Sequence, residues 1–415
     1  MSDIVQAGIG MPMQSAPRAR RGPSLALALL LAAATLTLYV VFNYYRMGDL
    51  LYAWSKTLAS YDYRQYLVMS KRWAMQYGHL VFLFSLLLLS RYIFIWDQVH
   101  PRLSKAIAVA MPYTIPIFII HFPLLYFFAA ITGHDPQNPL HEGRLLVLVL
   151  VTSVLFGVVC QRFKPLFDGL TDRLLAFVSS QRPAGDNTGA SPLTISRSHS
   201  EFLKVVRFVA TLSIAFGHYN FDQFSSFEIP GFDHWRRWAV PFFFMISGYF
   251  AMLSVDRSSG SALYDVVRRG TGIWYLALPM LLIVPLLDHI GFQADSWLYF
   301  LHSKFVSEEA GGPADLATYL ITLVNSMLFL NESWIYKLMG LGLHQTGLRA
   351  FSNDSYWFLC YLIPFTVMMI VMRKVAGWQK YLWLFLLVAV FGPPMMMLAP
   401  LFFAGCLAYL IHKRY

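Results

Sequence analysis

The chain has 415 residues, of which 57% are hydrophobic, 16% aromatic and only 13% charged. Apolar runs of about 18 residues or more recur along it, so the sequence predicts an all-α bundle of transmembrane helices. The formal net charge of +10 does not indicate a nucleic-acid partner, because the basic residues stand mostly at the ends of apolar runs, where they orient the chain and meet anionic lipid headgroups. The cysteines lie in apolar segments without metal-ligand spacing, so we expect small buried side chains and no metal: Cys160, Cys360 and Cys406.

The amino-terminal part predicts a tail followed by four membrane spans. Residues 1–23 are small and polar and end in a basic cluster, so we expect a disordered cytoplasmic tail. The apolar run at 24–45 exceeds the usual core of a signal peptide, which is about 7 to 15 residues, and this favours an uncleaved first span. Further spans are predicted at 77–96, 106–131 and 145–163.

The composition then changes abruptly. Residues 180–200 are rich in Ser, Pro, Gly and Asn and predict a flexible linker. Beyond it we expect a helix at 202–222 and spans at 238–256, 271–290, 356–372, 381–395 and 396–411, with the break between the last two at Pro393 and Pro394. The segment 316–330 is short for a span and predicts a re-entrant or interfacial helix, giving about ten spans, or about eleven if it crosses.

The distribution of Lys and Arg predicts the orientation of the chain. Most basic clusters fall on one side of this span order, whereas the loop at 291–315 carries acidic residues. The positive-inside rule therefore places both termini in the cytoplasm of a multi-pass protein of the inner or plasma membrane. The basic loop at 46–76 fits this orientation poorly, but the rule weighs less for long loops.

The helix at 202–222 carries Arg207 and His218 inside an otherwise apolar segment. Ionisable residues at bilayer depth are costly and usually functional. Eleven residues separate the two, close to three helical turns, so both side chains share one face about 16 Å apart along the axis. Asp222 follows His218 at i+4, where its carboxylate is expected to orient the imidazole. The alternative is that Arg207 anchors to headgroups and His218 is an ordinary interfacial histidine.

Two other helices carry polar residues at depth. His121 lies between Pro116 and Pro123, where a broken helix often lines a cavity; alternatively it hydrogen-bonds a carbonyl that one of the prolines has freed. Ser247 stands beside Gly248 after a run of aromatic residues. No GxSxG elbow surrounds this serine, so a close helix crossing is favoured over a nucleophile.

Arg268 and Arg269 stand where a helix enters from the cytoplasm. They are expected either to anchor that helix or to clamp a phosphate, because a guanidinium matches phosphate oxygens in bidentate fashion. The sequence has no Walker loop, dinucleotide fingerprint or HExxH motif, which argues against an ATP-driven pump and a metalloprotease.

Five motifs together resemble those of the membrane acyltransferase-3 family. KVVRFVATLSIAFGHYNF, with Arg and His separated by ten residues, resembles the first helix of that family. PFFFMISGYF is similar to its second-helix motif and RRGTGIWYLALP to its basic patch leading into the third helix. YWFLCYL, which contains Trp357, resembles a later Trp-containing span, and LFFAGCLAYL a Gly-containing one.

The order of these parts departs from the family. Family members usually begin with the Arg/His helix, whereas here residues 24–179 resemble the carboxyl-terminal part of the domain and residues 201–415 its amino-terminal part. We therefore predict a circular permutation joined by the linker at 180–200; the alternative is that the first four spans are an unrelated added module. The family's closing Glu-x-Pro-like motif here begins with Arg162, so no role is carried onto it.

The resemblance implies transfer of an acyl group, usually acetyl, from cytoplasmic acyl-CoA, which is the donor substrate, to a hydroxyl of an extracytoplasmic or lipid-linked glycan. His218, oriented by Asp222, is expected to be the general base. The cations expected to bind the CoA phosphates or stabilise developing negative charge are Arg207, Arg268 and Arg269. The residues expected to contact substrate are His121, Ser247 and Trp357. The alternatives are a transporter or flippase for a polar or glycolipid substrate, which internal repeats would favour, and an inactive scaffold.

Overall fold

The computed structural model describes residues 25–45, 73–94, 99–179, 195–226, 232–302, 316–334 and 350–414, together with Met47, Leu50 and Ala53. These residues are mostly helical and form no β-strand, apart from one isolated bridge between Ala350 and Asn353. The predicted all-α class is therefore confirmed. The predicted tail at 1–23 and most of the loop at 46–76 lie outside the described residues.

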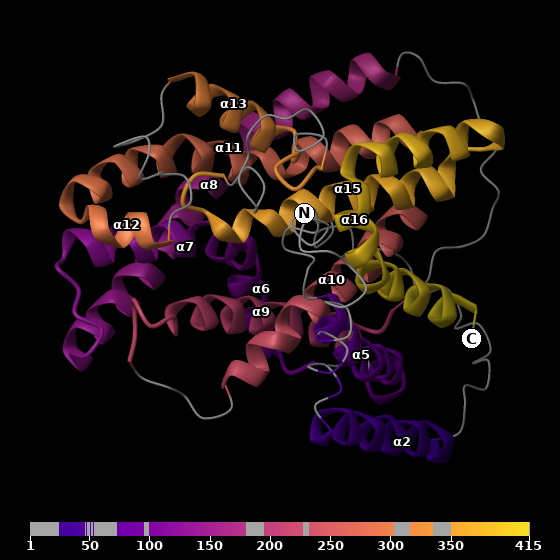
Figure 1. Ribbon diagram of the computed structural model, residues 1–415. Coiled ribbons are helices and arrows are strands. Elements are labelled where there is room, and N and C mark those ends of the chain that lie inside the picture. Colours follow the sequence, from indigo (N-terminus) through magenta and orange to yellow (C-terminus); the bar gives the residue numbers. More distant parts are fainter. Residues whose placement is uncertain are drawn as a thin grey trace.

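The helices of the amino-terminal part are α2 (Leu25–Tyr44), α5 (Trp73–Ile93), α6 (Pro101–Ala110), the 3-10 turn η2 (Met111–Tyr113), α7 (Thr114–Ile131) and α8 (Pro139–Ser179). Those that follow are α9 (Arg197–Tyr219), α10 (Phe232–Arg257), α11 (Ala262–Ala294), α12 (Ser296–His302), α13 (Leu316–Met327), the 3-10 turn η4 (Asp354–Tyr356), α15 (Trp357–Lys374) and α16 (Gly377–Arg414). Figure 1 shows α2 at the edge of this bundle, against α5.

Six helical stretches of the described chain are long and apolar enough to cross a membrane: Pro101–Ile131, Pro139–Phe177, Trp238–Arg257, Ala262–Ala294, Asp354–Lys374 and Met395–Arg414. The apolar helices at Ala33–Phe42 and His79–Ile93 are shorter. The chain is therefore a multi-pass helical membrane protein, but the predicted count of about ten spans is not confirmed. α13 has 12 residues and rises only about 18 Å, too little to cross a bilayer by itself.

α9 differs from the prediction at both ends. It begins at Arg197, where the Ser196 hydroxyl caps the helix by accepting from the His199 N–H at 3.3 Å. The predicted linker therefore ends by Ser196, and residues 180–194 lie outside the described residues. The helix ends at Tyr219, so Asp222 lies beyond it. Charged residues in its first half keep α9 out of the six stretches: Arg197, Glu201, Lys204 and Arg207.

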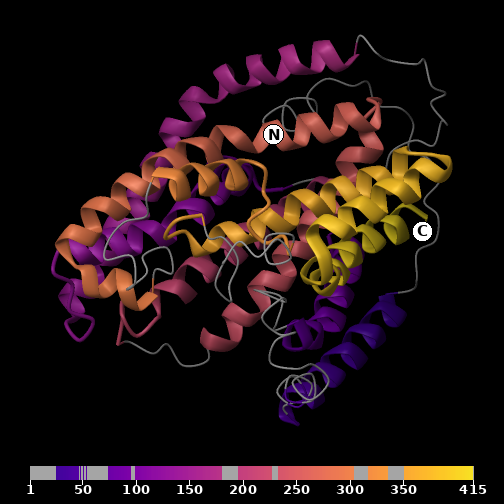
Figure 2. The ribbon, with the colours of Figure 1, turned by 45° about the horizontal axis from the view of Figure 1, so that its top comes forward.

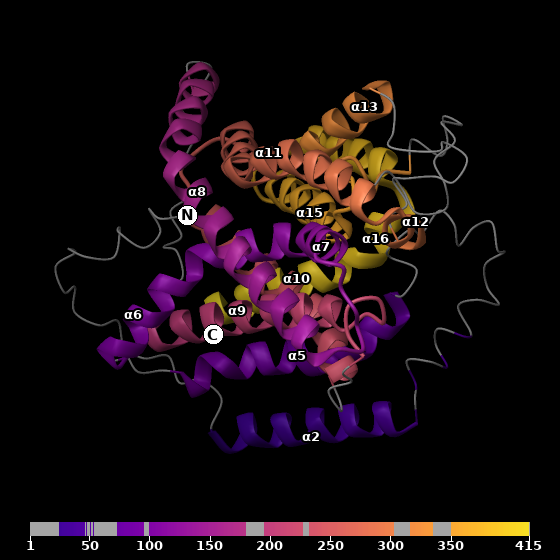
Figure 3. The same cartoon turned by 90° about the vertical axis from the view of Figure 1, so that its left-hand side faces the viewer.

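α8 extends well beyond the predicted span at 145–163. It is one helix of 41 residues, and the part after Pro165 projects away from the other helices (Figures 2 and 3). An i,i+4 ion pair between Lys164 and Asp168, 2.5 Å apart, supports this polar extension. The earlier part of α8 packs against α7 and α11, which is where it contributes to the interior of the bundle.

α10 and α16 cross closely through two glycines. A Cβ on Gly248 would lie 2.0 Å from the carbonyl oxygen of Phe402, and a Cβ on Gly405 would lie 1.8 Å from that of Met245. Only glycine permits this approach of two backbones. The close crossing predicted beside Ser247 is therefore confirmed at its neighbour, Gly248.

The predicted break in the last helix is confirmed, at Gly392 directly before Pro393. Gly392 has a left-handed φ of +69°, which glycine tolerates. Because Pro393 has no N–H, the carbonyl of Ala389 loses its helical donor. The indole N–H of Trp334 donates to that carbonyl at 2.7 Å and so satisfies it. The three cysteines are free and buried, as the sequence predicted.

Candidate functional site

α7 and α9 bring two histidines into direct contact. His121 Nε2 and His218 Nδ1 are 2.8 Å apart, although the residues are 97 positions apart in the chain. Their rings are nearly parallel, with an interplanar angle of 8°. His121 is only 1% exposed, and His218 is half-buried. The sequence marked each histidine separately but did not predict that they meet.

The contacts of His121 assign the tautomers of the pair. Its Nδ1 lies 2.9 Å from the carbonyl oxygen of Ile117 and 3.0 Å from that of Phe118. Carbonyl oxygens only accept, so Nδ1 carries the proton and Nε2 of the neutral ring has a lone pair. His218 Nδ1 must therefore donate to His121 Nε2, which leaves a lone pair on His218 Nε2. That nitrogen is chemically suited to accept a proton from a substrate.

A serine stands beside both imidazoles. Ser355 in η4 is buried, and its Oγ lies 3.5 Å from His121 Nε2 and 3.5 Å from His218 Nδ1. The loop that carries it is held on α7, because the Asn353 side-chain amide donates to the Ile119 carbonyl at 2.7 Å. Three separate parts of the chain therefore converge on one polar group inside the bundle.

Arg207 lies on α9, three helical turns before His218. Its guanidinium carbon is 5.7 Å from the centre of the Phe243 ring on α10, within the range of a cation–π contact. Its Nε is buried without a hydrogen-bond partner, and the Tyr275 hydroxyl on α11 interacts with it electrostatically. The side chain therefore faces its neighbouring helices and not the lipid.

The structure does not bring Arg268 and Arg269 into contact with Arg207. Arg268 is exposed, whereas Arg269 is half-buried and interacts electrostatically with Asp265 one turn before it. Arg269 nevertheless precedes Tyr275 by six residues, about 9 Å along α11. The two arginines therefore lie between the start of α11 and the level of Arg207.

Asp222 does not take the place predicted for it. It is exposed and lies after the end of α9, so the i+4 helical relationship to His218 does not exist. The hydrogen-bond partners of His218 that the structure does show include the imidazole of His121 and the hydroxyl of Ser355. The physical reason is that α9 terminates at Tyr219, before it reaches the aspartate.

The predicted substrate contacts lie at three different places. His121 belongs to the histidine pair, and it bonds carbonyls of its own helix that no proline has freed. Ser247 is half-buried near the crossing of α10 and α16. Trp357 is half-buried at the start of α15, two residues after Ser355, with its ring 6.0 Å from that of Phe244.

The segment after α9 is clamped to the first turn of α8 and to the loop before it. One carboxylate oxygen of Glu142 accepts from the Ser226 N–H at 2.8 Å and from the Ser225 hydroxyl at 3.1 Å. His134 Nε2 donates to the Phe224 carbonyl at 2.7 Å, and burial lowers the pKa of this imidazole below its ordinary value. The clamp fixes the chain directly beyond His218.

Sequence inspection missed Ser355, Asn353 and Glu142. None of them belongs to a spacing pattern, because each acts through a partner distant in sequence. The one available signal was position, since Ser355 directly precedes the YWFLCYL motif. Polar residues at the ends of membrane helices are too common for that signal to identify a site by itself.

The comparisons with known proteins agree with the motifs. Residues 200–413, just over half of the chain, match the family described as an acyltransferase domain, Acyl_transf_3. No curated protein and no solved structure matches the chain. The match includes Arg207 and His218, the two polar residues of α9. The chain therefore belongs to the membrane acyltransferase-3 family and is a multi-pass membrane enzyme that transfers acyl groups.

Proposed function

We propose that the enzyme moves an acyl group from cytoplasmic acyl-CoA to a hydroxyl of an extracytoplasmic or lipid-linked glycan, and that this acyl group is acetyl. The observation that carries this proposal is the 2.8 Å contact between His121 and His218. Together with the carbonyl contacts of His121, it leaves an unprotonated imidazole nitrogen on His218 inside the bundle. Activation of an alcohol requires such a base.

The transfer needs no reactant besides the acyl-CoA and the acceptor alcohol. The acceptor oxygen attacks the thioester carbonyl carbon while His218 Nε2 takes the proton of the hydroxyl. The tetrahedral intermediate then collapses, the carbon–sulfur bond breaks, and His218 returns the proton to the departing sulfur. The products are an ester and the free thiol of CoA. His121 Nε2 accepts from His218 Nδ1 throughout and so stabilises the imidazolium that forms in between.

The position of Arg207 supports the proposal that the acyl-CoA donor enters from the cytoplasmic side. It lies about 16 Å from His218 along α9, and Arg268 and Arg269 precede its level on α11. Cations spaced in this way suit the phosphates of CoA, with the flexible pantetheine arm directed along α9 toward the histidines. The buried Nε of Arg207 has no hydrogen-bond partner and is available to such a ligand.

The amino-terminal half completes the site. The family match begins at residue 200, yet His218 is bonded to His121 from α7, and α7 and α8 pack against α11. This arrangement supports the circular permutation, in which residues 24–179 supply the helices that usually close the domain. The Lys and Arg distribution supports cytoplasmic termini in the inner or plasma membrane.

Mass spectrometry of surface glycans tests this function. Cells that carry the gene are expected to show glycan masses raised by one acetyl group, and cells without it are not. In cells without the gene, expression of the full wild-type chain is expected to restore the acetyl group on the glycans, whereas expression of the His218→Ala chain is not. Identical glycan masses with and without the gene would contradict the proposed acceptor class.

A further inference from the structure

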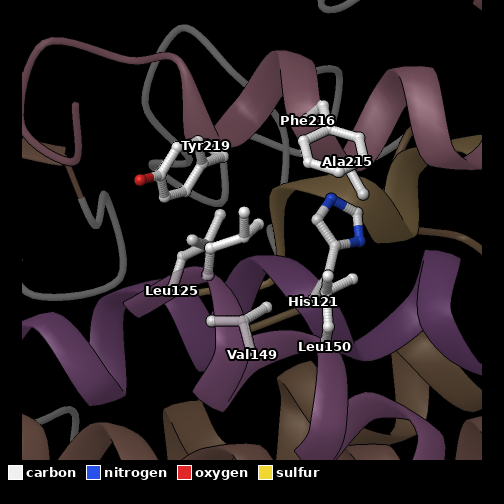
Figure 4. A pocket seen from close by; sticks show the side chains of 8 residues that line it. His121, Leu125, Val149, Leu150, Ala215, Phe216 and Tyr219 are labelled. Atoms are coloured by element: carbon white, nitrogen blue, oxygen red, sulfur yellow. The ribbon is translucent and has the colours of Figure 1, made fainter. Parts of the chain in front are cut away.

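An apolar slot opens beside the histidine pair, between α7, α8 and α9 (Figure 4). The imidazole of His121 lies at one side of it and Tyr219 at the other. Its cavity volume is about 10 Å³, the space of one water-sized group. The walls between these two residues are Leu125, Leu146, Val149, Leu150, Ala215 and Phe216.

The chemistry of the lining excludes a polar occupant. The His121 nitrogens already bond the carbonyls of Ile117 and Phe118 and the ring of His218. The Tyr219 hydroxyl points away from His121 (Figure 4) and bonds Ser225, and the other groups that form the walls are hydrocarbon. A water molecule needs two or more polar partners to be held. The slot therefore suits a small apolar group, about the size of one methyl.

We propose that the slot receives the methyl end of a two-carbon acyl group, and that Val149 and Ala215 set the acyl-chain length. This inference rests on the proposed acyl transfer. During transfer the carbonyl carbon must lie beside the alcohol whose proton passes to His218. The acyl tail then points away from the alcohol, and the slot is lined by His121, the hydrogen-bond partner of His218, so it lies one imidazole away from the base. Val149, which is 4% exposed, is one of the buried side chains that line the slot, so a longer tail would crowd it.

Competition between acyl-CoA donors of different length tests this assignment. With the full chain in membranes, we measure kcat/KM for acetyl-CoA, propionyl-CoA and butyryl-CoA. The wild type is expected to prefer acetyl, and Val149→Ala to raise the propionyl-to-acetyl ratio about tenfold, because one methylene in an apolar pocket is worth about that factor or more. The matched control is Val151→Ala on the same helix, where the side chain is 53% exposed; it should leave the ratio unchanged.

The opposite substitution fills the slot. Ala215→Val is expected to lower kcat/KM for acetyl-CoA about tenfold. Its affinity for CoA itself, which has no acyl group, should stay at the wild-type value and so shows that the fold is retained.

The two proposals fail in different ways. Equal use of all three donors by the wild type, or an unchanged ratio in Val149→Ala, would overturn the slot while acetyl transfer stands. A wild-type chain that transfers no acyl group from any CoA donor would overturn the proposed function and the slot together.

Discussion

The side-chain amide of Asn353 donates to the carbonyl of Ile119 at 2.7 Å. That carbonyl has no helical donor, because Pro123 occupies the position whose N–H would bond it. One proline-induced defect in α7 therefore serves as the attachment point for the loop that carries Ser355. The same turn of α7 presents His121 to His218.

This attachment can be tested by a double-mutant cycle. Asn353→Ala leaves the buried Ile119 carbonyl unpaired, and we expect a loss of about 1 to 3 kcal/mol in the free energy of unfolding. Pro123→Ala restores an N–H to that carbonyl, so the double variant should lose less stability than the sum of the single variants. Unfolding in detergent measures the cycle. Strict additivity would show that the two residues do not share the Ile119 carbonyl.

His121 should act as a positioning residue for His218. His121→Gln keeps a side-chain oxygen that can accept from His218 Nδ1, whereas His121→Leu leaves that N–H unpaired. We expect kcat to fall in both variants and to fall about tenfold further in the Leu variant, with KM for acetyl-CoA nearly unchanged. Steady-state kinetics at equal protein level measure the difference. Equal kcat in the two variants would show that hydrogen bonding by His121 has no part in the reaction.

Arg207 should govern donor affinity. Arg207→Ala removes a cation from the proposed CoA path, and loss of one charge-assisted contact is expected to weaken acetyl-CoA binding about tenfold or more. The matched control is Arg144→Ala in the first part of α8, where the side chain is exposed and bonds the Thr132 carbonyl. Equilibrium binding of acetyl-CoA measures both variants. An unchanged affinity in Arg207→Ala would refute the donor role.

Acid should loosen the clamp beyond α9. Burial holds the pKa of His134 in the folded protein below the ordinary value of 6.5, so the unfolded chain binds a proton more readily. The contribution of this residue to stability is therefore present above pH 6.5 and is lost as the pH falls below that value.

Hydrogen exchange at the segment Phe221–Ser226 measures this effect. After correction for the intrinsic dependence of the exchange rate on pH, exchange should become faster as the sample is acidified. His134→Asn retains an N–H donor for the Phe224 carbonyl but does not titrate in this range. It should remove the acid-induced part of the change. The same acid response in the variant would assign the effect to another group.

The sequence predicted the helical class, the helix with Arg207 and His218, and the break before Pro393, because each depends on local composition. It did not predict the pairing of His121 with His218, which depends on how α7 packs against α9. The role given to Asp222 assumed a helix that continues, and the end of α9 at Tyr219 removes that assumption.

The predicted number of about ten spans is not confirmed within the described residues. The apolar run at 202–222 did predict the helix α9, but α9 is not among the six stretches that are long and apolar enough to cross a membrane, and it packs between α7 and α10. Helices that are shielded from lipid by their neighbours tolerate charges that lipid-facing helices do not. Arg207 and His218, which mark the site, therefore also lower the mean hydropathy of the helix that carries them.

The most direct test is acetyl transfer by membranes that contain the full chain with His218→Ala, compared with His289→Ala. His289 is exposed and bonds Gln293, so its loss should leave transfer from radiolabelled acetyl-CoA at the wild-type rate. Loss of the general base should lower the rate about a hundredfold or more at equal protein level. Wild-type turnover by the His218→Ala chain would contradict the account.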